Sequence, residues 1–291
     1  MSKQEHEQEH ENEQKHEQVW FITGASRGLG LALAQEALAA GKRVVATARR
    51  TETLSGLVDA YGDRVLPLAL DVTDQARAES AVQRAVERFG RIDVVVNNAG
   101  YANMAPIEEV AMDDFRAQVE AVFFGTVLVT KAALPVLRRQ GSGHVIQIAS
   151  IGGRITAPGL GAYQSAKFAV EGFSGVLRQE VAPLGIKVTV AEPGGMRTDW
   201  AGSSMEVPAF DDAYRPTVGA MAERLRAGSG KEPIDPVKAA RALIGIADED
   251  EPPLHLLLGR DALQYGTAEL ERTSAEDKRW AHVAGSVDFE D

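Results

Sequence analysis

A short apolar segment followed at once by a glycine-rich turn constrains this chain more than any other feature. Residues 19–22 (Val-Trp-Phe-Ile) predict a buried strand, and Gly24, Gly28 and Gly30 follow directly. Apolar residues then recur at helical spacing as far as Gly41, which predicts a helix that ends there. This is the first half of a βαβ unit, in which glycines let the backbone approach a phosphate and the helix N-terminus attracts it.

The alternation of strand and helix patterns continues along the chain. Thr73 is a predicted N-cap for the second of the predicted helices. Further strands are predicted at 43–47, 65–70, 92–96, 144–148, 186–190 and 254–258, and helices at 74–89, 112–139, 162–181 and 237–247. The sequence therefore predicts an α/β fold, a single Rossmann-like domain whose doubly wound parallel sheet has about seven strands.

Three segments differ from this pattern. Residues 1–18 are rich in Glu, Gln and His and predict a disordered tail, whereas 19–260 form the predicted catalytic domain. Within that domain, 194–236 is rich in Gly, Ser, Pro and Ala and predicts an irregular substrate-binding lid. Residues 261–291 form a polar extension that is compatible with a helix and has no evident function.

Composition narrows the classes of function. The 291 residues include no cysteine and carry a formal net charge of −11, with no basic stripe. Disulfides, thiolate chemistry and nucleic-acid binding are therefore not expected. We expect no metal site, since the histidines of the tail are not preorganised. Without a long charge-free apolar run or a signal peptide, we expect a cytoplasmic protein that does not span a membrane.

Basic residues favour one form of a dinucleotide. NAD-binding units usually carry an acid at the end of the second strand, where it binds the ribose 2′-hydroxyl. Arg49 stands there instead, and Arg27 lies within the glycine turn. Because a guanidinium matches the geometry of phosphate, we expect NADP(H) to be favoured over NAD(H).

Three residues are candidates for catalysis. Tyr163 and Lys167 are four residues apart, so a helix places both on one face. Ser150 ends a predicted strand, at the edge of the sheet where ligands bind in such folds. The three side chains can converge on one point.

With these motifs in order, the chain resembles the classical short-chain dehydrogenase/reductase family from about residue 19 to 259. The family's T-G-x-x-x-G-x-G motif corresponds to Thr23–Gly30, and its Asn-Asn-Ala-Gly motif to Asn97–Gly100. The resemblance implies catalysis by Ser150, Tyr163 and Lys167. It implies cofactor contacts from Thr23, Gly24, Ser26, Arg27, Gly28, Leu29, Gly30, Arg49, Asp71, Val72, Asn98, Ala99, Gly100, Tyr163, Lys167, Pro193, Gly194 and Thr198.

The resemblance also implies a mechanism. Tyr163 exchanges a proton with the substrate oxygen while hydride moves to or from the cofactor. Lys167 lowers the pKa of Tyr163 and holds the nicotinamide ribose, and Ser150 positions the substrate oxygen. The expected activity is that of an NADPH-dependent ketone or aldehyde reductase.

One departure from the family keeps alternatives open. Val122 stands where the family usually has an asparagine that helps hold a water in the proton path, and its backbone carbonyl can preserve that path. The expected consequence is reduced but real activity. The alternatives are a nucleotide-binding sensor with weak or no turnover, and an enoyl or 3-oxoacyl reductase.

Substrate and assembly are less constrained. The predicted pocket is largely apolar, which suggests a hydrophobic carbonyl or alcohol compound; its candidate residues are Tyr101, Met104, Leu160, Trp200 and Met205. The resemblance implies a homodimer or homotetramer assembled through the long helices 112–139 and 162–181.

Overall fold

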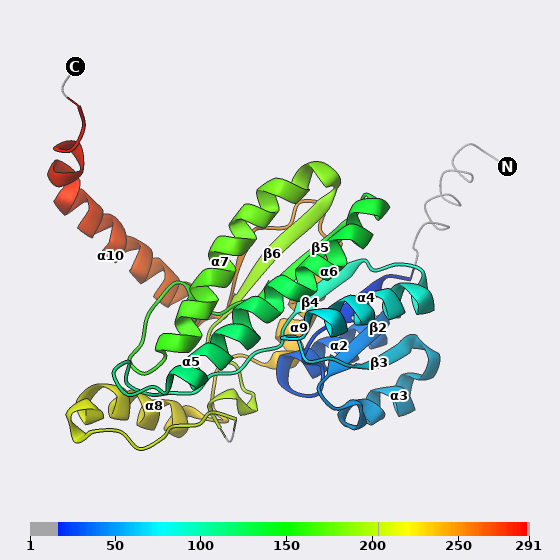
Figure 1. Cartoon of the computed structure of the whole chain (residues 1–291), viewed down its shortest axis with the longest axis horizontal. Coiled ribbons are helices and arrows are strands. Elements are labelled where there is room, and N and C mark those ends of the chain that lie inside the picture. The colour runs from blue at the N-terminus through cyan, green and yellow to red at the C-terminus, as the bar shows by residue number, and fades with distance from the viewer. Residues whose placement is uncertain (1–16, 203, 290–291) are drawn as a thin grey trace.

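A computed structural model describes residues 17–202 and 204–289 and contains one seven-stranded parallel sheet (Figure 1). The strand order is β3-β2-β1-β4-β5-β6-β7. The strands are β1 (Val19–Ile22), β2 (Arg43–Ala48), β3 (Val65–Ala69), β4 (Val94–Asn97), β5 (Gly143–Ile148), β6 (Ile186–Pro193) and β7 (His255–Leu258). The order reverses between β1 and β4, which is where ligands bind in open α/β sheets. The predicted fold class is confirmed.

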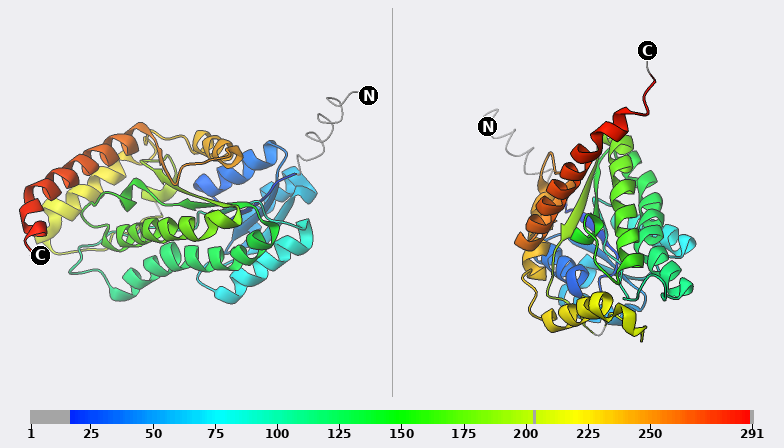
Figure 2. Two further views of the ribbon diagram at one scale, coloured as in Figure 1. Left: turned by 90° about the horizontal axis from the view of Figure 1, so that it is seen from above. Right: turned by 90° about the vertical axis from the view of Figure 1, so that its left-hand side faces the viewer.

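Helices cover both faces of the sheet (Figure 2). On one face pack α2 (Gly28–Ala39), α3 (Ser55–Tyr61) and α9 (Pro236–Asp248), and on the other α4 (Gln75–Phe89), α6 (Gly125–Gln140) and α7 (Gly161–Val181). Burial from both sides explains why the strands are almost continuously apolar: the four residues of β1 are at most 1% exposed.

The predicted helix 112–139 is interrupted. It consists of α5 (Met112–Val119), a π-helical turn (Glu120–Phe124) and α6. Among the described residues, only Met112–Gln140 is long and apolar enough to cross a membrane, with a mean hydropathy of 1.6. That is weak evidence for a span, because a helix packed against a soluble core passes the same test; here α5 packs on α7, and α6 on α4 and the sheet.

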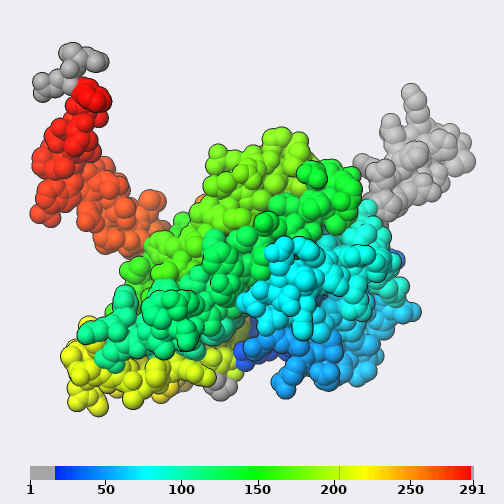
Figure 3. Space-filling view, in the orientation of Figure 1, coloured from blue at the N-terminus to red at the C-terminus, as the bar shows by residue number. Residues whose placement is uncertain are grey.

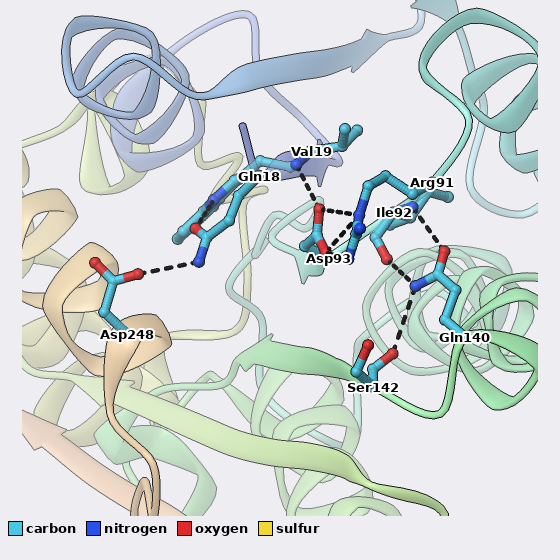
Figure 4. Close-up of polar contacts among 9 residues, drawn as sticks. Gln18, Val19, Arg91, Ile92, Asp93, Gln140, Ser142 and Asp248 are labelled. Carbon is cyan, nitrogen blue, oxygen red and sulfur yellow. Dashed lines mark hydrogen bonds and ion pairs between the residues drawn. The ribbon is translucent and has the colours of Figure 1, made fainter. Parts of the chain in front are cut away.

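The start of the sheet is anchored by side chains (Figure 4). Asp93 accepts a 2.8 Å hydrogen bond from the amide of Val19, and Gln18 donates one of 3.1 Å to Asp248 at the end of α9. Gln18 is the last residue of the predicted tail; residues 1–16 of that tail lie outside the described part of the chain.

One cap differs from the prediction. Asp74 caps α4 by accepting a 3.0 Å hydrogen bond from the amide of Arg77. The Thr73 hydroxyl instead donates to Asp71 over 2.7 Å, so the predicted cap at Thr73 was wrong. Both residues are good caps by type, and the turn that places Asp74 at the helix start decides between them.

The last third of the chain contains one unexpected helix and one that the sequence only allowed. The segment 194–236, expected to be irregular, includes α8 (Ala220–Gly228). The polar extension forms α10 (Arg260–Gly285), which projects from the rest of the molecule (Figure 3). Only its first turns are buried, through Ala262 and Gly266, which fixes the base of this helix beside β7.

Candidate active site

The glycine turn after β1 is hydrogen bonded to the end of β4. The Thr23 hydroxyl accepts from the amides of Asn98 and Ala99 over 2.9 and 3.0 Å. The Asn98 amide group donates to the carbonyls of Thr23 and Gly24 over 2.9 and 3.2 Å. A Cβ at Gly30 would lie 2.5 Å from Asn98 Nδ2, so only glycine fits there. Two segments predicted to contact one cofactor therefore form one rigid unit.

This unit has the features of a phosphate-binding turn. Gly24 and Gly28 have φ values of +65° and +56°, a region that favours glycine. No described side chain caps α2, so its first amides stay available as donors. Thr198 lies on the opposite side, with Cγ2 3.5 Å from the place of a Cβ at Gly28. The positive φ values and the free helix amides fit the phosphates of a dinucleotide at the glycine turn.

The two predicted phosphate-binding arginines differ in their surroundings. Arg49 is exposed at the end of β2, and its charge, after the hydrogen bonds from Thr73, helps to hold the pKa of Asp71 below its usual value. Arg27 donates a 2.6 Å hydrogen bond to Ser204 and lies 3.6 Å from Asp199. Arg27 thus connects the glycine turn to the predicted lid.

Ser150, Tyr163 and Lys167 converge at the end of β5. Ser150 and Tyr163 share a side-chain hydrogen bond, and the Ser150 hydroxyl also accepts from the amide of Gly152 over 3.0 Å. Lys167 Nζ donates to the carbonyl of Ile148 over 2.6 Å and lies 5.6 Å from the centre of the Tyr163 ring. The predicted grouping of the three side chains is present.

Burial controls the proton affinities in this group. It raises the pKa of Tyr163 to about 12, although the hydrogen bond from Ser150 acts in the opposite direction. It lowers the pKa of Lys167 to about 8, against the charge of Glu171. The net shift of the Tyr163 pKa is therefore upward and not the expected downward one, because loss of solvent outweighs the contacts that favour the phenolate. A neutral Tyr163 is a proton donor at neutral pH.

Val122 lies in the π-helical turn, within the same buried cluster as Tyr163. Its carbonyl accepts a 2.9 Å hydrogen bond from the Thr126 hydroxyl. Its Cγ2 atom is 3.4 Å from the place of a Cβ at Gly100. Lys167 Nζ is 4.0 Å from the same position, that of a Cβ added to Gly100. Lys167 and Val122 therefore both lie next to Gly100.

Four of the five predicted pocket residues gather around Tyr163. Met104, Leu160 and Met205 are buried in one cluster with it, and Trp200 packs on that cluster. Tyr101 lies outside this cluster, where burial and the charge of Asp114 raise its pKa. The surroundings of Tyr163 are therefore mostly apolar.

Comparison with known proteins agrees with this geometry. A family model described as short chain dehydrogenase matches residues 18–208. The chain belongs to the short-chain dehydrogenase family. It is therefore an oxidoreductase. Solved structures that are similar to it hold the nicotinamide cofactor NADP.

Relatives extend the match beyond the motifs. This short-chain dehydrogenase is 57% identical to oxidoreductase BOA17 of Botryotinia fuckeliana, over 92% of this chain and 98% of that protein. A short-chain dehydrogenase structure from Streptomyces avermitilis is 41% identical, with a TM-score of 0.88 over 94% of this chain and all of that one. A Burkholderia cenocepacia structure in complex with NADP is 26% identical, with a TM-score of 0.71 over 90% and 96% of the two chains.

A cluster of charged residues next to α7 was not predicted; it consists of Arg154, Glu171, Glu192 and His255. Arg154 donates to Glu192 over 2.7 Å, and His255 Nδ1 lies 2.9 Å from Glu192 and 3.2 Å from Glu171. Burial and the charge of Glu192 raise the pKa of Glu171 to about 8. The four residues come from four separate elements, so sequence spacing carries no signal for them. The single charge of the Arg154 guanidinium pairs with Glu192, and a Glu171 carboxyl with a pKa of about 8 is mostly protonated at neutral pH, so little negative charge remains to hold a cation.

Proposed function

We propose that this short-chain dehydrogenase reduces a ketone or aldehyde with NADPH, using Tyr163 as the proton donor. The convergence of Ser150, Tyr163 and Lys167 carries the proposal, with Lys167 close to Gly100 at the end of the segment that is bonded to the glycine turn. A bound reduced nicotinamide cofactor would supply the hydride.

The protein side chains would supply the proton and the orientation. Ser150 donates a hydrogen bond to the substrate oxygen and holds it near the Tyr163 hydroxyl. Tyr163 gives its proton to that oxygen as the charge develops, and the Lys167 ammonium stabilises the phenolate that remains. Burial of Tyr163 and Lys167 strengthens these interactions, because water is excluded from both, while Ser150 is half-buried.

The residues around the site support one cofactor and one class of substrate. Arg27 and Arg49 support NADPH over NADH, and NADP is the ligand named for the Burkholderia structure. The apolar cluster around Tyr163 supports a hydrophobic carbonyl compound. Two relatives, 38% and 35% identical, are named 3-ketodihydrosphingosine reductase and NADPH-dependent 3-dehydrocapnine reductase.

The test follows NADPH absorbance over a panel of ketones and aldehydes of increasing size. We expect turnover that prefers NADPH to NADH. Tyr163→Phe should lose turnover yet keep NADPH binding, because the ring and the packing remain. Turnover that survives in Tyr163→Phe would contradict the proposed role of the hydroxyl.

A second candidate is a nucleotide sensor with weak or no turnover. It is favoured by Val122, which replaces the asparagine that helps hold a water in the family's proton path. Tight NADPH binding without turnover on any compound of the panel would support it. The same panel therefore decides between the two candidates.

We also propose that the protein assembles as a homodimer or homotetramer. Large apolar side chains are exposed on the long helices, with Phe124 43%, Phe168 42% and Val176 55% exposed. Light scattering of the purified protein tests this, and a monomer at micromolar concentration would contradict it.

A further inference from the structure

The turn that follows β6 is held by distant segments of the chain. The amide of Gly194 donates to the carbonyl of Leu258 over 2.9 Å, and the amide of Arg197 to that of Ile234, also over 2.9 Å. Between them, the amide of Gly195 donates to a side chain, Asp261 Oδ2, over 2.7 Å. Asp261 is 66 residues further along, in the first turn of α10.

The carboxylate of Asp261 sits in a niche lined by glycines. A Cβ at Gly194 would lie 2.5 Å from Asp261 Cγ, and a Cβ at Gly259 would lie 2.5 Å from Oδ1. The Oδ1 atom is buried and has no hydrogen-bond partner among the described residues. This tight fit, with one charged acceptor bonded to the turn, defines where the turn lies.

The turn in question faces the candidate cofactor site. It leads to Thr198, whose hydroxyl accepts from the amide of Trp200 over 3.4 Å. Thr198 also lies against Gly28 of the glycine turn. Trp200, which is bonded to Thr198, packs on Tyr163, and the nicotinamide must lie beside Tyr163 for hydride transfer. Displacing Gly195 would therefore move Thr198 relative to both the glycine turn and the expected place of the nicotinamide.

We infer that Asp261 is a positioning residue that holds the turn Pro193–Thr198 in place for the nicotinamide half of the cofactor. The inference rests on the proposed use of NADPH. The base of α10 would then help to position the cofactor, although Asp261 does not itself touch the reacting atoms. Binding of the adenosine half, at the other end of the glycine turn, should not depend on it.

The test compares two ligands on three variants of the full chain. Dissociation constants are measured calorimetrically for NADPH and for adenosine 2′,5′-bisphosphate, which lacks the nicotinamide half. We expect Asp261→Ala to weaken NADPH binding by about tenfold, the effect of losing one charge-assisted hydrogen bond, and to leave the bisphosphate unchanged. Asp261→Asn keeps an acceptor of the same size and should bind NADPH almost normally.

The control is Asp277→Ala, an exposed aspartate further along α10, which should leave both constants unchanged. If Asp261→Ala does not fold, Asp261→Ser replaces it, because serine is too short to reach Gly195. An equal loss for both ligands, or no loss for either, would overturn the inference. Absence of NADPH binding in the unmodified protein would instead overturn the proposed function, and the inference with it.

Discussion

Trp200 packs against Tyr163, with the ring centroids 5.3 Å apart and the ring planes at 55°. Trp200 belongs to the segment after β6, whereas Tyr163 lies in the first turn of α7. The indole thus covers the proposed proton donor from the side of the predicted lid and limits the space beside it.

Replacing Trp200 should change substrate size preference. We expect Trp200→Ala to raise kcat/KM for bulky aryl ketones relative to small ones by about tenfold, because the ring that narrows the pocket is gone. Trp200→Phe should show a smaller change. The measurement is a ketone series of increasing size, and a constant ratio across that series would show that Trp200 does not shape the pocket.

Restoring the family's asparagine should test the role of Val122. We expect Val122→Asn to raise kcat and alter its pH profile, because a side chain that can hold water returns to the proton path. A cost in stability of about 1–3 kcal/mol accompanies it if the buried amide is not fully hydrogen bonded. Thermal unfolding and pH–rate profiles of both proteins measure the two effects. Unchanged turnover and an unchanged pH profile would make the substitution irrelevant.

Arginine variants should separate the cofactors. We expect Arg27→Ala and Arg49→Ala each to raise KM for NADPH about tenfold and to leave KM for NADH unchanged, because only NADPH carries the 2′-phosphate. Arg50→Ala, at the next exposed position, is the matched control. An equal loss for both cofactors would mean that these side chains act on the fold and not on the phosphate.

A pair of glycine variants should test the rigid turn. At Gly30 an added Cβ meets Asn98 Nδ2 at 2.5 Å, whereas at Gly245 in α9 nothing lies within 4 Å. We expect Gly30→Ala to lose cofactor binding. Gly245→Ala should raise the free energy of unfolding by about 1 kcal/mol, because alanine favours the helix. Calorimetry with NADPH and denaturant unfolding provide the readouts, and normal binding by Gly30→Ala would refute the close packing.

The raised pKa of Glu171 makes stability depend on pH. Well below pH 4.5, the folded and unfolded chains both hold the proton, so there is no penalty. Between there and about pH 8 the unfolded chain releases it first, so the folded state becomes less favourable as pH rises. We therefore expect Glu171→Gln to gain melting temperature over the wild type as pH rises from 5 to 8.

Glu180→Gln, an exposed position on the same helix, controls for loss of a surface charge. Its melting temperature should follow that of the wild type at every pH. If the Glu171→Gln difference is flat over this range, the carboxyl group is ionised in the folded state.

The sequence alone determined the order of the seven strands and the identity of the central motifs, although it predicted neither α3 nor α8. Strand β1 is four apolar residues before a glycine turn, and a parallel strand buried on both faces can hardly have another pattern. Tyr163 and Lys167 share a helix face because four residues make about one turn. Such local periodicities survive folding, so the predicted architecture was confirmed.

Only the tertiary structure decided the contacts between distant segments and the proton affinities that follow from them. Asp261 reaches Gly195 across 66 residues, and Glu171 meets Glu192 and His255 from separate elements. The pKa of Tyr163 is raised and not lowered because neighbours from elsewhere in the chain exclude water from it. Burial depends on every segment that packs around a group, and no local pattern in the sequence encodes it.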